Sequence, residues 1–255
     1  MTSSSAGHVL ITGASRGLGA AFVRAFAERG HPVTLLARDE AAIHALATDL
    51  ESRGLRAAAI ACDVTDPAMV EKAFDHAVAK LGPLSIVVNN AGVVLPVSII
   101  ANTPPEAWAD HIGVNLVGAF NVLHYAVPRL AAGAIVVNVS SGAALEPMVG
   151  RSAYCAGKAG LNMLSSVLAL EEGPRGLRVH AFTPGPSDTE THVLIRSAAA
   201  VQRIPTASRQ LQPAADAARF LLWLTSDAAA DLAGRFVSSR DPVLRERAGM
   251  PPVRS

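Results

Sequence analysis

Short apolar runs alternate with longer amphipathic segments along most of the chain. Residues 8–13, HVLITG, form a continuous apolar run that ends in glycine, and residues 15–30 then place Leu18, Phe22 and Phe26 at helical spacing. A short apolar run is typical of a buried strand, and a 3.6-residue period is typical of a helix packed against it. The opening of the chain therefore predicts a strand, a tight turn and a helix.

The same alternation repeats further along the chain. We expect further strands at 32–38, 57–64, 84–92, 133–141 and 177–185, and further helices at 39–54, 66–82, 108–130, 152–173 and 214–227. Near-continuous Val and Ile in the strands are typical of parallel sheets covered by helices on both faces. The pattern predicts the α/β class, with a Rossmann-type doubly wound parallel sheet in a single domain over residues 1–255.

The pattern loosens after the last predicted strand. Residues 186–212 are punctuated by prolines and are expected to form an irregular segment just past a strand end, where a substrate lid would lie. From about residue 238 we expect an irregular C-terminal tail. Sheets of this kind bind ligands beyond the carboxyl ends of their strands, so the candidate site lies at that edge.

Composition and charge narrow the possible functions. Only 17% of residues are charged, the net charge is +1 and the basic residues are scattered, which argues against a nucleic-acid partner. Cys62 and Cys155 stand far apart without metal-ligand spacing, so we expect no metal site and two free thiols in a reducing compartment. The first residues lack a basic start and a long apolar run, so no membrane anchor and a cytoplasmic location are expected.

The segment TGASRGLG, residues 12–19, lies between the first predicted strand and helix. Glycines there allow a sharp turn and a close approach of the backbone to a pyrophosphate, while the helix start presents free N–H groups to the anion. In this position the pattern predicts dinucleotide binding; the alternative is a plain tight turn.

The end of the second predicted strand bears on the choice of cofactor. An acidic residue there would accept hydrogen bonds from the ribose of NAD, but Ala37 is neutral and Arg38 is cationic. Arg16 in the glycine turn can reach the same region, and two guanidiniums bind a 2′-phosphate well. NADP is therefore favoured, although Asp39 complicates the choice and Arg38 could simply be solvated.

Tyr154 and Lys158 stand four residues apart in a predicted helix, on one face. A nearby ammonium favours the phenolate form, which makes a tyrosine a usable proton donor or acceptor. Ser140 and Ser141, at the end of the preceding predicted strand, are candidate donors to a carbonyl oxygen. Taken singly, such residues more often serve packing, a solvated charge or a helix cap. Their joint placement at the ligand edge favours catalysis.

In order and position these residues resemble the short-chain dehydrogenase/reductase family. The resemblance covers roughly residues 9–189 and rests on the motifs TGASRGLG, CDV, NNAG, VNLVG, VSS and YCAGK. It implies a catalytic set of Asn115, Ser141, Tyr154 and Lys158, with Ser141 rather than Ser140 because the family's serine stands thirteen residues before its tyrosine. It also implies that Lys158 binds the nicotinamide ribose and that Asn115 holds a water linking Lys158 to solvent.

The resemblance further implies a set of contacts to NADP(H). These are Gly13, Ser15, Arg16, Gly17, Leu18, Gly19, Arg38, Asp63, Val64, Asn89, Ala91, Gly92, Tyr154, Lys158, Pro184, Gly185, Ser187 and Thr189. Asp63 and Val64 would border the adenine, and Pro184, Gly185 and Thr189 the nicotinamide amide.

Within the family, YCAGKAGLNMLSSVLALEE followed by PGPSDTE is similar to sepiapterin reductase and the benzil-reductase-like carbonyl reductases, which reduce pterin side-chain ketones or α-dicarbonyl compounds. Ser238 stands about where that subgroup has a pterin-anchoring aspartate, with Asp241 a little beyond. Apolar residues near the site favour a hydrophobic or aromatic carbonyl. Arg196, Arg203 and Arg209 of the predicted lid could meet a substrate acid, although a role in surface solubility is more typical of such residues.

Together these features predict NADPH-dependent reduction of a ketone or aldehyde to an alcohol by hydride transfer, with Tyr154 as general acid/base. The alternative is a non-catalytic NADP-binding regulator or redox sensor of the same fold. Residues 108–120 and 152–164 resemble the family's dimer surface, so a homodimer or homotetramer is expected.

Overall fold

The computed structural model describes residues 6–204 and 211–253, whose strands form one parallel sheet in the order β3-β2-β1-β4-β5-β6-β7. The strands are β1 (His8–Thr12), β2 (Val33–Ala37), β3 (Ala57–Ala61), β4 (Leu84–Asn89), β5 (Leu130–Val139), β6 (Arg178–Thr183) and β7 (Phe236–Ser238). The helices are α1 (Gly17–Glu28), α2 (Glu40–Ser52), α3 (Pro67–Leu81), α4 (Pro105–Ile112), α5 (Gly118–Ala126), α6 (Ser152–Glu172), α7 (Glu190–Val201), α8 (Ala214–Leu224) and α9 (Pro242–Arg247). The predicted doubly wound α/β fold is confirmed.

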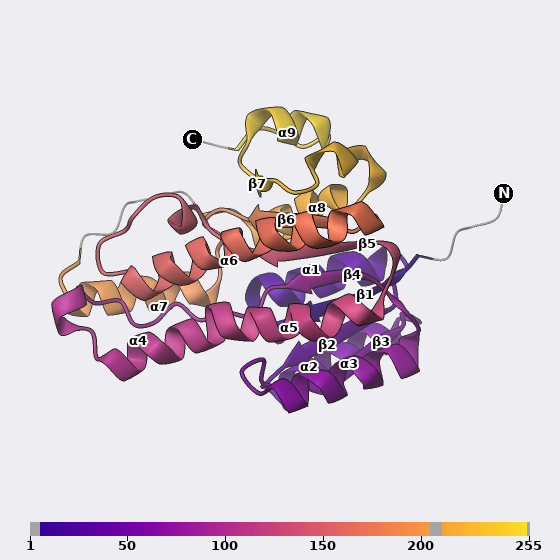
Figure 1. The fold of residues 1–255 in the computed structure, drawn as a ribbon, viewed down its shortest axis with the longest axis horizontal. Coiled ribbons are helices and arrows are strands. Elements are labelled where there is room, and N and C mark those ends of the chain that lie inside the picture. The colour runs from indigo at the N-terminus through magenta and orange to yellow at the C-terminus, as the bar shows by residue number, and fades with distance from the viewer. Residues whose placement is uncertain (1–5, 205–210, 254–255) are drawn as a thin grey trace.

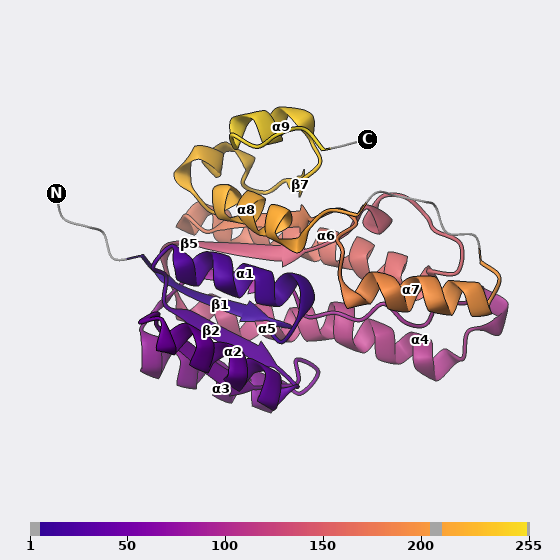
Figure 2. The same cartoon turned by 180° about the vertical axis from the view of Figure 1, so that it is seen from behind.

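Two apolar cores sandwich the sheet, because successive side chains of a strand point to opposite faces. On β1, Val9 and Ile11 pack in the core formed with α1, α2 and α8, whereas Leu10 packs in the core formed with α3, α5 and α6. Figure 1 looks onto α5 and α6, and Figure 2 looks from behind onto α1 and α8. Because both faces of the sheet are covered by helices, successive strand positions are buried in one core or the other and carry apolar side chains.

Local signals set the start of several helices. The Asp39 carboxylate accepts the N–H of Ala42 at the start of α2, and the Asp66 carboxylate accepts two backbone N–H groups at the start of α3. Pro67 occupies the first turn of α3, where its missing N–H costs nothing. Such caps satisfy N–H groups that have no partner within the helix.

One long helix was expected over residues 108–130, but the structure interrupts it. A π-helical turn, Gly113–Val117, separates α4 from α5 and contains the buried Asn115. The Asn115 carboxamide exchanges two hydrogen bonds of 2.8 Å with the backbone of Val93. The apolar periodicity of the sequence does not reveal such a tertiary contact, so the interruption was not predicted. Single π-helical turns often occur at functional positions.

The segments expected to be irregular contain regular elements. Helix α7 lies within residues 186–212, and α9 lies within the tail expected from about residue 238, directly after β7. β7 extends the sheet beside β6, and Asp241 caps α9 through the N–H groups of Val243 and Leu244. A strand of three residues is too short for its periodicity to be read, and its pairing with β6 is a long-range contact.

Helices α4 and α7 extend beyond the edge of the sheet toward which the strands point (Figure 1, Figure 2). The carboxyl ends of the strands therefore point toward the side of the molecule on which these helices lie. Within residues 6–204 and 211–253, no helix has the length and apolar character needed to cross a bilayer.

Candidate active site

A cavity of about 920 Å³ opens along the carboxyl edge of the sheet. It lies where the chain leaves neighbouring strands β1 and β4 toward opposite faces, which is where sheets of this type bind ligands. The predicted site residues that line it are Gly13, Ser15, Arg16, Gly17, Leu18, Gly19, Arg38, Asp63, Val64, Ala91, Gly92, Ser141, Tyr154, Lys158, Pro184, Gly185, Ser187 and Thr189. Asn89 and Asn115 lie behind this lining.

The glycine turn forms one end of the cavity. Gly13 has a φ of +64°, and a Cβ atom on Gly19 would lie 2.0 Å from the carbonyl oxygen of Gly13. The Asn90 carboxamide donates to the carbonyl oxygens of Thr12 and Gly13 at 2.9 and 3.2 Å, which ties the end of β4 to the turn. Bare backbone next to the N-terminus of α1 fits a pyrophosphate, because free N–H groups and the helix dipole favour an anion there.

Two arginines flank the glycine turn. Arg38 lies 3.8 Å from the Asp63 carboxylate and Arg16 lies 3.5 Å from the Glu190 carboxylate. Both guanidiniums are exposed, so these ion pairs are weak and easily exchanged for a stronger anion. The Asp39 carboxylate is engaged as the cap of α2. At this end of the cavity, the two guanidiniums favour the 2′-phosphate of NADP. A carboxylate in the place of Ala37 or Arg38 would instead favour the ribose of NAD.

Tyr154 and Lys158 lie one turn apart on α6 and both line the cavity. Lys158 Nζ lies 5.8 Å from the Tyr154 ring centroid and donates to the carbonyl oxygen of Val139 at 2.7 Å. Burial lowers the pKa of Lys158 to about 8, because desolvation disfavours the ammonium. The phenol and the ammonium thus lie in one cavity, as a proton-transferring pair requires.

Ser140 and Ser141 both line the cavity but use their hydroxyls differently. Ser141 Oγ accepts the N–H of Ala143 at 3.2 Å, which leaves its own proton available for donation. Ser140 Oγ donates to Oδ1 of Asn162, so its proton is already committed. The arrangement favours Ser141 over Ser140 as a donor to a bound carbonyl oxygen.

Asn115 supports the wall behind Lys158. Its Oδ1 atom is so close to Gly92 that a Cβ atom there would lie 2.8 Å from it. Its Nδ2 group also contacts Nε2 of His111, whose Nδ1 lies 2.7 Å from the carbonyl oxygen of Leu95. Burial lowers the pKa of His111, and a neutral imidazole protonated on Nδ1 satisfies both contacts.

The predicted cofactor contact Asn89 does not line the cavity. Its Nδ2 group donates to the carbonyl oxygen of Ala119 and to Oδ1 of Asn138, so the side chain joins neighbouring elements in the interior. Asn90, the second asparagine of NNAG, lines the cavity instead. Successive side chains point to opposite sides at a strand end, and the motif alone does not tell which of the two faces the ligand.

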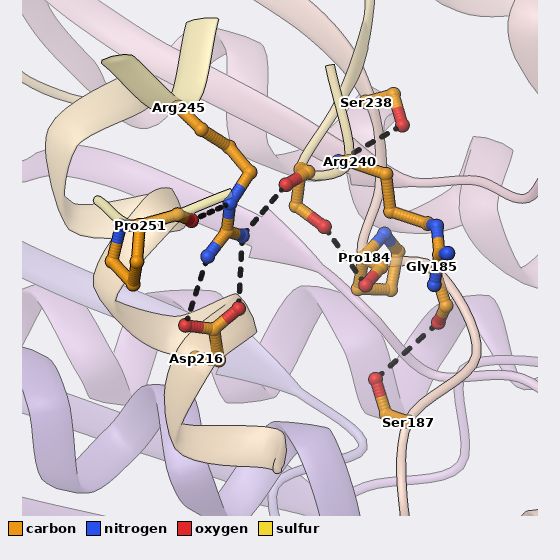
Figure 3. Close-up of polar contacts among 9 residues, drawn as sticks. Pro184, Gly185, Ser187, Asp216, Ser238, Arg240, Arg245 and Pro251 are labelled. Carbon is orange, nitrogen blue, oxygen red and sulfur yellow. Dashed lines mark hydrogen bonds and ion pairs between the residues drawn. The ribbon is translucent and has the colours of Figure 1, made fainter. Parts of the chain in front are cut away.

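The C-terminal segment holds the loop after β6, as Figure 3 shows. The buried Arg245 on α9 pairs with Asp216 on α8 at 2.9 Å and donates to the carbonyl oxygens of Ser239 and Pro251. Ser239 Oγ donates to the carbonyl oxygen of Pro184 at 2.9 Å. The tail is thus linked to the predicted nicotinamide contacts through a chain of polar interactions.

Sequence reasoning also missed other cavity residues, among them Arg151, Phe236 and Arg240. Arg151 stands three residues before Tyr154, a spacing that could have revealed it. No local pattern marks Phe236 or Arg240, which reach the cavity because β7 pairs with β6.

The predicted lid and tail contribute unevenly to the cavity. Ile195 on α7 and Ile204 line it, whereas Arg196 and Arg203 are exposed and lie outside the lining. Residues 205–210, which include Arg209, lie outside the described residues. Ser238 lines the cavity, and Asp241 does not, since its carboxylate caps α9.

Comparison with known proteins shows the family to which the chain belongs. The model of a family described as short chain dehydrogenase matches residues 7–200. The chain belongs to that family. It is 34% identical over 235 residues to 3beta-hydroxysteroid dehydrogenase 1 of Eggerthella lenta, covering 89% of each chain. It is 33% identical to cis-4-hydroxycyclohexanecarboxylate dehydrogenase of Sinomonas cyclohexanicum, covering 90% of this chain and 93% of that protein.

Two solved structures match most of the chain. One from Burkholderia cenocepacia in complex with NADP matches with a TM-score of 0.82 and 30% identity, covering 90% of this chain and 94% of that chain. The actinorhodin polyketide ketoreductase with NADPH matches with a TM-score of 0.84, covering 93% and 97%, and at 24% identity it supports the fold alone. The family and the oxidoreductase fold expected from the sequence are confirmed.

Proposed function

We propose that the protein is an NADPH-dependent carbonyl reductase that converts a ketone or aldehyde into an alcohol. One observation carries the proposal: Ser141, Tyr154 and Lys158 line the same cavity as the glycine turn. A proton donor and a cradle for an anionic dinucleotide within one cavity are what a reduction of this type requires.

Each residue of the catalytic set has a separate role in the proposed reduction. NADPH, which the glycine turn, Arg16 and Arg38 would hold, would supply the hydride for the carbonyl carbon. Ser141 donates a hydrogen bond to the substrate's carbonyl oxygen and polarises it, and Tyr154 gives that oxygen its proton. Lys158 keeps positive charge beside the phenol, and Asn115, as the family resemblance implies, holds a water that resupplies the proton from solvent. In the oxidative direction Tyr154 accepts the alcohol proton.

The cofactor assignment rests on the shape and charge of the glycine-turn end. Gly13 and Gly19 leave room for a pyrophosphate, and Arg16 and Arg38 supply guanidiniums for a 2′-phosphate. Relatives solved with NADP or NADPH support this choice. The remaining predicted contacts stay part of the proposal, except that Asn90 replaces Asn89.

The substrate is proposed to be a hydrophobic, aromatic or α-dicarbonyl compound, as in the sepiapterin and benzil reductase subgroup. Leu145, Met148, Val149 and Ile204 give the cavity an apolar wall, which supports this class. The two relatives named above act, by their names, on a steroid and on a cyclohexane hydroxy acid, and both substrates contain saturated rings. A ring-containing carbonyl compound is therefore the first choice for testing.

The domain, assembly and location are also proposals. We treat residues 1–255 as one catalytic domain in which α7 and Ile204 act as the substrate lid. Exposed apolar side chains on and beside α5 and on α6 support a homodimer or homotetramer; they are Val117, Phe120, Met163, Val167 and Leu170. The free cysteines, Cys62 and Cys155, fit a cytoplasmic location.

The direct test is an initial-rate screen with NADPH and NADH in parallel against cyclic ketones, aromatic ketones, aldehydes and diketones. We expect turnover with preference for NADPH, and a loss of roughly 100- to 10,000-fold in kcat for Tyr154→Phe because general acid catalysis is removed. Binding of NADPH without turnover of any carbonyl, with Tyr154→Phe indistinguishable from wild type, would instead support the non-catalytic regulator.

A further inference from the structure

Arg151 lines the cavity, but the proposed reaction does not use its charge. It immediately precedes α6, and its backbone is fixed on both sides. The N–H of Arg151 donates to the carbonyl oxygen of Met148. The N–H of Ser98 donates to the carbonyl oxygen of Gly150 at 2.9 Å, and Ser98 forms a single parallel β-bridge with Arg151. The side chain is thus presented to the cavity from a rigid support.

The guanidinium of Arg151 stacks on the catalytic ring. Its central carbon lies 4.5 Å from the centroid of the Tyr154 ring. The cation thus lies over the ring of Tyr154, and both side chains line the cavity, so that one substrate could contact them together. Met148 and Val149 line the same cavity, as does the acidic residue Glu146.

Three other arginines of the described chain that are largely shielded from solvent have carboxylate partners. The side chains of Arg129, Arg178 and Arg245 are 20%, 19% and 2% exposed, and each forms an ion pair. Arg151 is also partly buried, but no ion pair joins it to an acid within residues 6–204 and 211–253.

The environment of Arg151 makes its charge costly. Its Nε atom is buried and has no hydrogen-bond partner in the described part of the chain. Burial lowers the pKa of Arg151, and the groups that act against this are the side chains of Tyr154 and Cys155 rather than a carboxylate. A partly buried cation without a counter-charge is favourably compensated by an anion, and here an anion can reach it through the cavity that it lines.

We propose that Arg151 binds a carboxylate of the substrate, so that the enzyme prefers oxo acids in which a carboxylate lies within a few bonds of the reacting carbonyl. This inference rests on the proposed carbonyl reductase function. The Arg151 guanidinium would pair with the carboxylate while Tyr154 and Ser141 hold the carbonyl oxygen. Two fixed contacts on one small substrate would also set which face of the carbonyl is presented.

The test uses matched acids and esters. We would measure kcat/KM of the purified full-length enzyme with NADPH for 3-oxo- and 4-oxocyclohexanecarboxylate and for their methyl esters, whose ketones have similar intrinsic reactivity. Wild type should prefer at least one acid over its ester. Arg151→Met should reduce kcat/KM for that acid by roughly 10- to 100-fold and leave the ester within about threefold, because a charged hydrogen-bonded pair is lost.

Two controls separate anion binding from other roles. Arg151→Lys keeps the charge without the planar fork and should retain part of the acid preference. Arg175→Met removes an exposed arginine that pairs with Glu172 and should leave the acid-to-ester ratio unchanged. A readout without turnover is thermal stabilisation of the NADP⁺-saturated enzyme by the oxo acid but not by its ester, since neither NADP⁺ nor the ketone can donate a hydride. Arg151→Met should abolish this stabilisation.

Several outcomes would overturn the inference. One is a wild type with no preference for either acid, or one that reduces neutral ketones and neither acid. Another is an Arg151→Met enzyme that loses acid and ester activity equally, which would mean that Arg151 acts through Tyr154. If no carbonyl compound of the wider screen is reduced, the proposed reductase function fails first.

Discussion

The two ends of the cavity are built in different ways. The glycine-turn end comes from a short stretch of chain and depends on backbone shape, since a Cβ atom added at Gly19 would lie only 2.0 Å from the Gly13 carbonyl oxygen. The substrate end is assembled from distant segments around Arg151, Ile204 and Phe236, and depends on side chains. A backbone cradle tolerates little change but suits one ligand shape, whereas a side-chain wall can be altered residue by residue.

The largest predicted effect tests the backbone cradle. In Gly19→Ala the new methyl group collides with the Gly13 carbonyl, so the turn must shift, and we expect NADPH affinity to fall by about 100-fold or more. Fluorescence titration of NADPH measures this. Gly30→Ala is the matched control at the other end of α1: φ is +84° but nothing lies within 4 Å of the added Cβ. It should cost roughly 1 kcal/mol of unfolding free energy and leave NADPH affinity intact. Equal losses of affinity would refute the distinction.

A smaller effect tests the side-chain wall. Ser141→Ala removes the free hydroxyl donor, and kcat should fall roughly 100-fold with little change in NADPH affinity. Ser140→Ala, whose hydroxyl is committed to Asn162, should retain kcat within several-fold. Steady-state kinetics of both variants on one ketone distinguishes them, and a reversed order would assign the donor role to Ser140.

The smallest expected effect is the contribution of Lys158 to the pH dependence of the unfolding free energy. The pKa of Lys158 is lowered to about 8 in the folded protein from 10.5, so between these values the unfolded chain binds more protons and stability rises with pH. In the free enzyme, the unfolding free energy should increase by about 2 kcal/mol more in wild type than in Lys158→Met between about pH 7 and 9.5. Urea unfolding across this range measures the difference. Parallel pH profiles would show that the buried ammonium is not destabilising.

Much of the fold followed from periodicity. The strand and helix around the glycine turn, and α6 beginning at Ser152, agree with the expected elements because their apolar faces repeat regularly over many residues. The π-helical turn around Asn115 and strand β7 could not be read in this way, since each is set by contacts with residues far away in the chain.

The site was predictable where motif and geometry coincide. Tyr154 and Lys158 share a face because their spacing on a helix requires it. Asn89 and Asn90 are chemically identical neighbours, and only the orientation of the strand end decides which of them faces the cavity. Arg151 was overlooked because an arginine before a helix is usually solvated, and its stacking on Tyr154 depends on a side-chain conformation.

The anchoring of the tail by Arg245 has a practical consequence for handling the protein. Its guanidinium is held by the carbonyl oxygen of Pro251 as well as by Asp216, and Ser239 carries this restraint to Pro184. Trimming the chain before Pro251, or fusing a bulky tag there, would remove or displace one acceptor of a buried cation. An affinity tag is therefore better joined at the N-terminal side. There β1 begins at His8, and only the carboxyl end of this strand is directed toward the cavity.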